Sequence, residues 1–157
     1  MEHQLEIGGL FRVAELELIY RKNPEPVRTL QVSCSITAYE VLKQTWDQNK
    51  IDLVEQFKIL LLDNRNTCLG VAEISAGGMT CCPVDARIVF ATALQSKTTK
   101  LILAHNHPSG QLRPSQEDID LTDKLRAAGK LLDIKVVEHL IMTSNGYYSM
   151  ADNGLIP

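Results

Sequence analysis

Residues 100–118 read KLILAHNHPSGQLRPSQED. The apolar run at 101–104 predicts a short buried strand, and the residues after it predict a loop and then a helix over 116–128. His105 and His107 are two positions apart in extended backbone, so both side chains project to the same side and can hold one metal ion. A third ligand must come from elsewhere in the chain, and Asp118 can supply it from the first turn of the helix.

Asp118 is expected to face the core, because three residues follow it at helical spacing on the same side: Leu121, Thr122 and Leu125. A carboxylate held there requires compensation, which a metal ion provides. Residues 115–118 also fit a capping box, in which Ser115 and Asp118 only satisfy amides at the helix start. The two interpretations can coexist at Ser115. The combined spacing His-x-His-x₇-Ser-x₂-Asp is far more specific than either half.

The rest of the chain predicts one mixed sheet packed with helices, an α/β fold. We expect one domain over 1–157, in which residues 1–34 form an N-terminal strand and loop extension and 35–157 form the core. Helices are predicted from 38 to 48, after a cap at 35–37, from 84 to 95, and from 116 until Gly129 ends the helix. Strands are predicted at 13–20, 57–62, 68–74, 100–104, 136–142 and 147–150.

Composition narrows the function classes. The 157 residues carry 16 Lys and Arg against 19 Asp and Glu, a net charge of -3, and only 5% are aromatic. This balance argues against a dedicated nucleic-acid binder, so we expect weak, salt-sensitive DNA binding at most. No apolar run is long enough to span a membrane and no signal peptide is evident, which predicts a cytoplasmic protein. The four cysteines lack C-x-x-C spacing and are expected to be reduced thiols.

The motif resembles the JAMM motif of the JAB/MPN+ metalloprotease domains. The form HNHPSG at 105–110, followed by PSQED at 114–118, resembles the RadC branch of that family. The resemblance extends over about residues 35–157. It implies a mixed α/β three-layer sandwich similar to cytidine deaminases. It also implies a zinc ion held by His105, His107 and Asp118.

The same resemblance assigns the remaining catalytic roles. Ser115 would hydrogen-bond the developing oxyanion, and an upstream glutamate would activate a zinc-bound water. Glu55, immediately before the strand at 57–62, matches the family pattern and is favoured over Glu73, in the neighbouring strand. The implied activity is a metallopeptidase or isopeptidase, and the expected substrate is an unidentified peptide or isopeptide.

A non-catalytic DNA-repair or mobile-element accessory is the alternative, although the chain lacks room for the helix-hairpin-helix region of full-length RadC proteins. A zinc nucleobase deaminase needs His-x-Glu and Pro-Cys-x-x-Cys, which this sequence lacks. His139 is expected to be a satisfied core histidine that can also support the metal ligands. Arg113 either meets an anionic substrate or is solvated.

Overall fold

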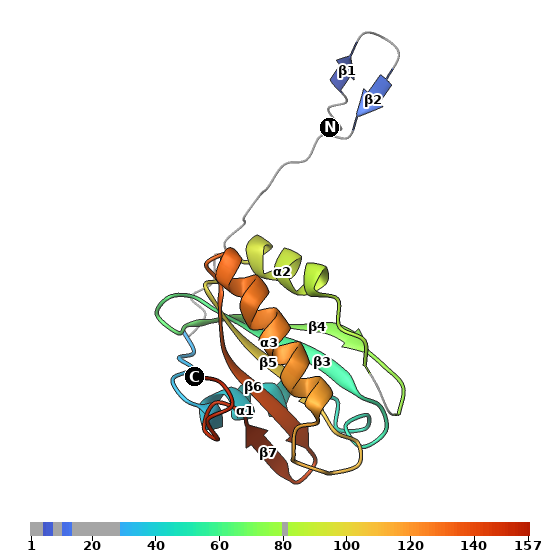
Figure 1. The fold of residues 1–157 in the computed structure, drawn as a ribbon, viewed down its shortest axis with the longest axis vertical. Coiled ribbons are helices and arrows are strands. Elements are labelled where there is room, and N and C mark those ends of the chain that lie inside the picture. Colours follow the sequence, from blue (N-terminus) through green and yellow to red (C-terminus); the bar gives the residue numbers. More distant parts are fainter. Residues whose placement is uncertain (1–4, 8–10, 14–28, 80–81) are drawn as a thin grey trace.

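The computed structural model describes residues 5–7, 11–13, 29–79 and 82–157. A five-stranded sheet with strand order β4-β3-β5-β6-β7 forms the main body, and helices cover both of its faces (Figure 1). β1 and β2 pair with each other in a separate antiparallel sheet. In chain order the elements are β1 (Leu5–Ile7), β2 (Phe11–Val13), α1 (Ser35–Thr45), β3 (Gln56–Leu62), β4 (Cys68–Ala76), α2 (Ala86–Gln95), β5 (Lys100–Asn106), α3 (Gln116–Leu131), β6 (Lys135–Thr143) and β7 (Gly146–Ser149).

The central strands are apolar because both faces of the sheet are covered. Every residue of β3 is buried, and β5 is buried from its second residue onward. β3 pairs antiparallel with β4 and with β5, β5 pairs parallel with β6, and β6 pairs antiparallel with β7. The predicted α/β class with one mixed sheet is therefore confirmed.

Successive side chains of β3 and β5 point to opposite faces of the sheet, so the core is divided into two hydrophobic clusters. Leu60 and Ile102 point to one face, where they pack with Leu42 of α1. Ile59 and Leu103 point to the other face, where their cluster includes residues of α2 and α3. The molecule thus has a helix layer, a sheet layer and a second helix layer, as the resemblance implied.

The structure differs from the sequence predictions at the ends of several elements. α1 begins at Ser35, three residues earlier than predicted, and Thr37 closes a capping box with Cys34. α3 continues through Gly129 to Leu131, so the glycine is not a helix stop. An added Cβ at Gly129 would lie 2.3 Å from the backbone oxygen of Ile134, which shows that close packing requires this glycine. Of the predicted strand at 13–20, β2 includes only its first residue, and 14–20 lie outside the described residues.

The topology carries the metal motif to one place. β5 lies between β3 and β6, and α3 makes the crossover from β5 to the parallel strand β6. Consequently the carboxyl end of β5 and the amino end of α3 are joined by one loop, residues 107–115. Side chains from the end of β5 and from the first turn of α3 therefore lie close together.

Candidate metal centre

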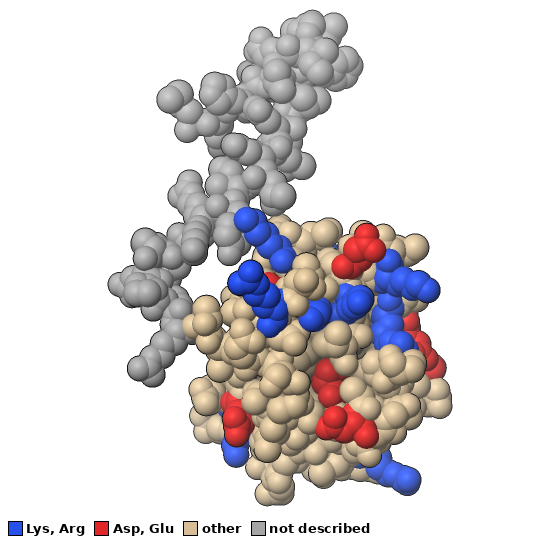
Figure 2. Space-filling view, turned by 90° about the vertical axis from the view of Figure 1, so that its left-hand side faces the viewer, with Lys and Arg blue, Asp and Glu red and all other residues tan. Residues whose placement is uncertain are grey.

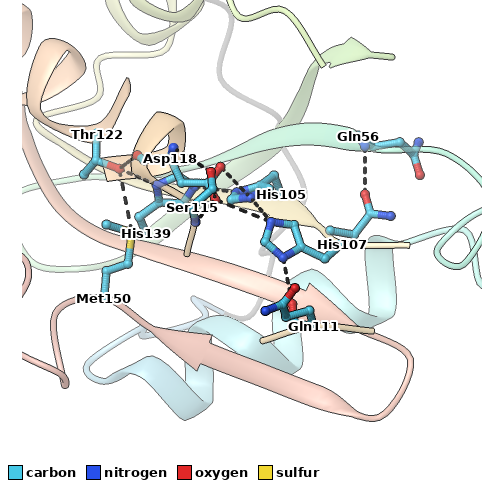
Figure 3. Close-up of polar contacts among 10 residues, drawn as sticks. Gln56, His105, His107, Gln111, Ser115, Asp118, Thr122, His139 and Met150 are labelled. Carbon is cyan, nitrogen blue, oxygen red and sulfur yellow. Dashed lines mark hydrogen bonds and ion pairs between the residues drawn. The ribbon is translucent and has the colours of Figure 1, made fainter. Parts of the chain in front are cut away.

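The end of β5 positions the two histidines. His105 is in the strand, 2% exposed, with its ring stacked near Phe57. His107 follows the strand, and its backbone amide donates to the Met142 carbonyl at 3.0 Å. The Nδ1 atom of His107 lies 2.7 Å from the Gln111 carbonyl, which can only accept, so this nitrogen carries the hydrogen. The Nε2 atoms of the two rings lie 2.9 Å apart and face the same point (Figure 3).

Asp118 completes the cluster from the first turn of α3. Its Oδ1 lies 3.0 Å from His105 Nε2, its Oδ2 lies 3.5 Å from His107 Nε2, and its side chain is only 13% exposed. The ligand atoms of the three residues all lie within 4.8 Å of one another. Asp118 faces inward for the reason given by the sequence, since Leu125 on the same helix side is fully buried. The structure thus brings His105, His107 and Asp118 together at the end of β5, as the sequence predicts.

Charge inside the cluster is balanced by an ion pair. The hydrogen bond with Asp118 raises the pKa of His107 above its ordinary value of 6.5. Burial opposes the ionisation of Asp118, but its contacts with His105, His107 and the Ser115 amide together hold the pKa of this carboxyl well below its ordinary range. Below pH 6.5 the pair is therefore mainly an imidazolium and a carboxylate when no metal is bound.

Ser115 is the N-cap of α3 and contacts Asp118 at the same time. Its Oγ accepts from the Asp118 amide at 3.2 Å and donates to Asp118 Oδ2 at 2.8 Å. Its own amide donates to Oδ2 at 2.7 Å. The capping box and the orientation of the carboxylate thus use the same atoms. To serve a substrate oxygen, the Ser115 hydroxyl would have to rotate away from Asp118.

The two candidate glutamates lie in different surroundings. Glu55 lines the same cavity as His105 and His107, and its charge helps raise the pKa of His107. Glu73 accepts from Gln56 Nε2 at 2.7 Å and lies 3.8 Å from Lys58 Nζ. It is not among the residues that line this cavity. These positions favour Glu55 over Glu73 as the base.

Asn106, between the two histidines, ties β5 to the segment that carries Glu55. It is fully buried, and its Oδ1 accepts from the Gln56 amide at 2.7 Å. Its Nδ2 donates to the carbonyls of Ile51 and Val54 at 2.6 and 2.8 Å. Asn106 thus braces residues 51–56 against the end of β5, so one buried amide holds together the strand with the histidines and the segment that carries Glu55.

The cluster opens into a cavity of about 1040 Å³. Its wall combines the polar residues of the motif with an apolar part formed by Phe57, Met79, Leu121 and Tyr148. Arg113 also lines the wall, which makes it available to an anionic group. Cys82 lies on the wall too, but burial raises the pKa of its thiol, so it does not resemble an activated nucleophile.

His139 is buried behind the cluster, and both of its ring nitrogens have partners. Nε2 lies 2.8 Å from His105 Nδ1, and Nδ1 lies 2.6 Å from Thr122 Oγ1. The expectation of a satisfied core histidine agrees with these contacts. Sequence reasoning used Thr122 only to mark a helix face and missed its contact with His139. Its position one turn after Asp118 was the available signal.

Comparison with known proteins now identifies the family. The model of the family described as "RadC-like JAB domain" matches residues 32–155. The chain belongs to this family. Curated relatives carry the name UPF0758 protein: the one from Flavobacterium johnsoniae is 40% identical over 144 residues, which are 91% of this chain and 62% of the relative. The one from Symbiobacterium thermophilum is 35% identical over 144 residues, 92% of this chain and 60% of the relative.

This RadC-like chain thus spans less than two thirds of the length of these relatives. A further UPF0758 protein, from Syntrophotalea carbinolica, is 41% identical over 102 residues, 65% of this chain and 45% of the relative. Among the residues that the structure describes, no helix has both the length and the apolar character needed to cross a membrane.

Proposed function

We propose that this RadC-like JAB domain is a zinc-dependent hydrolase that cleaves an amide bond, in a peptide or an isopeptide. One observation carries the proposal: two imidazole nitrogens and a carboxylate meet at a cavity that Glu55 also lines. A set of one buried and two half-buried side chains, with their other polar atoms already hydrogen-bonded, is typical of metal ligands.

The donor set suits zinc in chemistry and in spacing. Zinc prefers histidine nitrogen and carboxylate oxygen at about 2.0–2.2 Å, which sets neighbouring ligand atoms of a tetrahedron about 3.3 Å apart. The Nε2 atoms of His105 and His107 lie 2.9 Å apart, and each lies near that spacing from one oxygen of Asp118, 3.0 Å from Oδ1 for His105 and 3.5 Å from Oδ2 for His107. These three side chains would hold the ion at the wall of the cavity, which would leave room for a water molecule or a substrate carbonyl beside it. Zinc bound there supplies Lewis acidity, which lowers the pKa of a water molecule and polarises a carbonyl.

The chain's own residues supply the remaining steps. The Glu55 carboxylate accepts a proton from the attacking water and delivers it to the leaving amine. The Ser115 hydroxyl, once rotated away from Asp118, donates to the oxygen that gains negative charge. The apolar wall around Phe57 and Leu121 accommodates a substrate side chain, and Arg113 can pair with an anionic group.

Glu55→Gln tests the proposal against a matched control, Glu73→Gln. We expect the zinc-loaded wild type to cleave members of a mixed peptide and isopeptide library. Glu55→Gln should reduce kcat by about 10²–10⁴-fold, the usual contribution of a general base, while zinc content stays the same. Glu73→Gln should retain activity. Equal activity of wild type and Glu55→Gln would contradict the assignment, and a complete lack of cleavage by the zinc-loaded wild type would contradict the hydrolase.

A DNA accessory function is the second proposal. Figure 2 shows Lys and Arg side chains close together across the upper part of one face, with Asp and Glu beside and below them. Lys100 and Lys135 are register partners at the start of β5 and β6, the opposite end of β5 from His105. Cationic side chains grouped in this way can contact phosphates without base readout. A phosphate contact made by Lys100 or Lys135 would thus lie at the opposite end of β5 from the metal centre.

A further inference from the structure

A buried line of hydrogen bonds runs from the metal centre into the core. His105 Nδ1 lies 2.8 Å from His139 Nε2, and His139 Nδ1 lies 2.6 Å from Thr122 Oγ1. Thr122 Oγ1 in turn lies 2.6 Å from the backbone carbonyl of Asp118 (Figure 3). The exposed fractions of His105, His139 and Thr122 are 2%, 0% and 1%, so no solvent competes for these bonds.

The Asp118 carbonyl is the last acceptor in this line, and it determines which atom of each hydrogen-bonded pair is the donor. The Asp118 carbonyl can only accept, so the Thr122 hydroxyl donates to it and offers a lone pair to His139. His139 then carries its hydrogen on Nδ1 and presents the lone pair of Nε2 to His105. His105 must therefore carry its hydrogen on Nδ1, which leaves Nε2 free to bind a metal ion.

The opposite direction would block the metal centre. If Thr122 donated to His139, then His139 Nε2 would donate to His105 Nδ1. His105 would have to carry its hydrogen on Nε2, at the point where the ligand atoms converge. Each ring nitrogen of His139 faces one partner, so the neutral ring has a single hydrogen to place between Thr122 and His105. The choice between the two directions is thus a choice of tautomer.

We propose that His139 and Thr122 are positioning residues that hold His105 in the tautomer required for metal binding. This inference rests on the proposed zinc site and adds two residues that do not contact the metal position. The line begins at one ligand, His105, and ends on the backbone of another, Asp118. It therefore connects the β5 ligand with the α3 ligand through a chain of donors and acceptors that has no gap.

Thr122→Val is the test, because valine keeps the shape of threonine and removes its hydroxyl. His139 would lose its acceptor at Nδ1 and would move its hydrogen to Nε2, which reverses the line. We expect zinc affinity to fall about 10–100-fold, the usual effect of removing a group that orients a ligand. Thr122→Ser keeps the hydroxyl and should restore affinity to within about threefold. The matched control is Thr98→Val, since Thr98 is buried and its Oγ1 has no hydrogen-bond partner among the described residues.

The readouts are zinc affinity by competition with a chelator and the histidine tautomers by long-range ¹H–¹⁵N NMR of the zinc-loaded protein. We expect hydrogen on Nδ1 of both His105 and His139 in the wild type, and a loss of affinity in Thr122→Val but not in Thr98→Val. A hydrogen on His139 Nε2 in the wild type would overturn the positioning role of His139 and Thr122 alone. A zinc affinity of Thr122→Val within about threefold of wild type would do the same. Failure of the wild type to bind zinc would overturn the proposed function as well.

Discussion

Zinc affinity should fall as the pH is lowered, because His107 takes up a proton on the nitrogen that zinc requires. In the zinc-free protein, Asp118 raises the pKa of His107 above 6.5, through a contact of 3.5 Å between His107 Nε2 and Asp118 Oδ2. Zinc needs the lone pair on that same nitrogen, so binding must release the proton. The experiment therefore changes only the pH, from 8 to 5.5.

The magnitude follows from the direction of the shift. A pKa above 6.5 means that at pH 5.5 at least about ten of every eleven His107 side chains are protonated. Protonation of His107 alone then weakens zinc affinity at least about tenfold at pH 5.5, which is about 1.4 kcal/mol. Each additional pH unit below that weakens the affinity by about another factor of ten. The stability of the zinc-free protein has the opposite dependence. The His107 contribution is fully present below pH 6.5 and is lost as pH rises through the raised pKa.

The assay is a zinc titration against a chromophoric chelator at several pH values, with the chelator's own pH dependence measured separately. Calorimetry in two buffers of different ionisation enthalpy counts the protons released per zinc. We expect about one proton from His107 near pH 6. An affinity that stays within twofold between pH 8 and pH 5.5 would refute the reasoning.

Three other predictions test the surroundings of the site. Asn106→Ala removes the three hydrogen bonds of a fully buried side chain, and should destabilise the protein by about 3 kcal/mol and lower Tm by about 6–12 °C, measured by thermal unfolding. Gly129→Ala should cost on the order of 1–3 kcal/mol in denaturant unfolding, whereas Gly70→Ala, whose Cβ would meet nothing within 4 Å, should leave stability within about 0.5 kcal/mol. DNA should bind weakly and without sequence preference, so sub-micromolar affinity for duplex or single-stranded DNA at physiological salt would favour the accessory function.

The convergence of His105, His107 and Asp118 could be predicted because two local periods and one short loop bring these residues together. Strand alternation relates His105 to His107, helical spacing turns Asp118 inward, and a single loop joins the two elements. The fold class followed for a similar reason, since the apolar runs at 57–62 and 101–104 are too continuous for strands with one exposed face.

The features that escaped prediction depend on contacts between distant elements. His139 meets His105 only because β6 lies beside β5, and Thr122 meets His139 only because α3 crosses that pair. The role of Gly129 was misjudged because its constraint comes from the Ile134 carbonyl in the following turn rather than from helix termination. Asn106 forms hydrogen bonds with residues 51–56, about fifty positions earlier in the chain, and no local sequence pattern predicts them.

Anomalous diffraction at the zinc absorption edge, from crystals of the protein purified without added chelator, tests the central claim most directly. We predict a single strong peak about 2.0–2.2 Å from His105 Nε2, His107 Nε2 and one carboxylate oxygen of Asp118. A cluster without zinc in zinc-supplemented crystals, or a peak held by other side chains with these three unligated, would contradict the account.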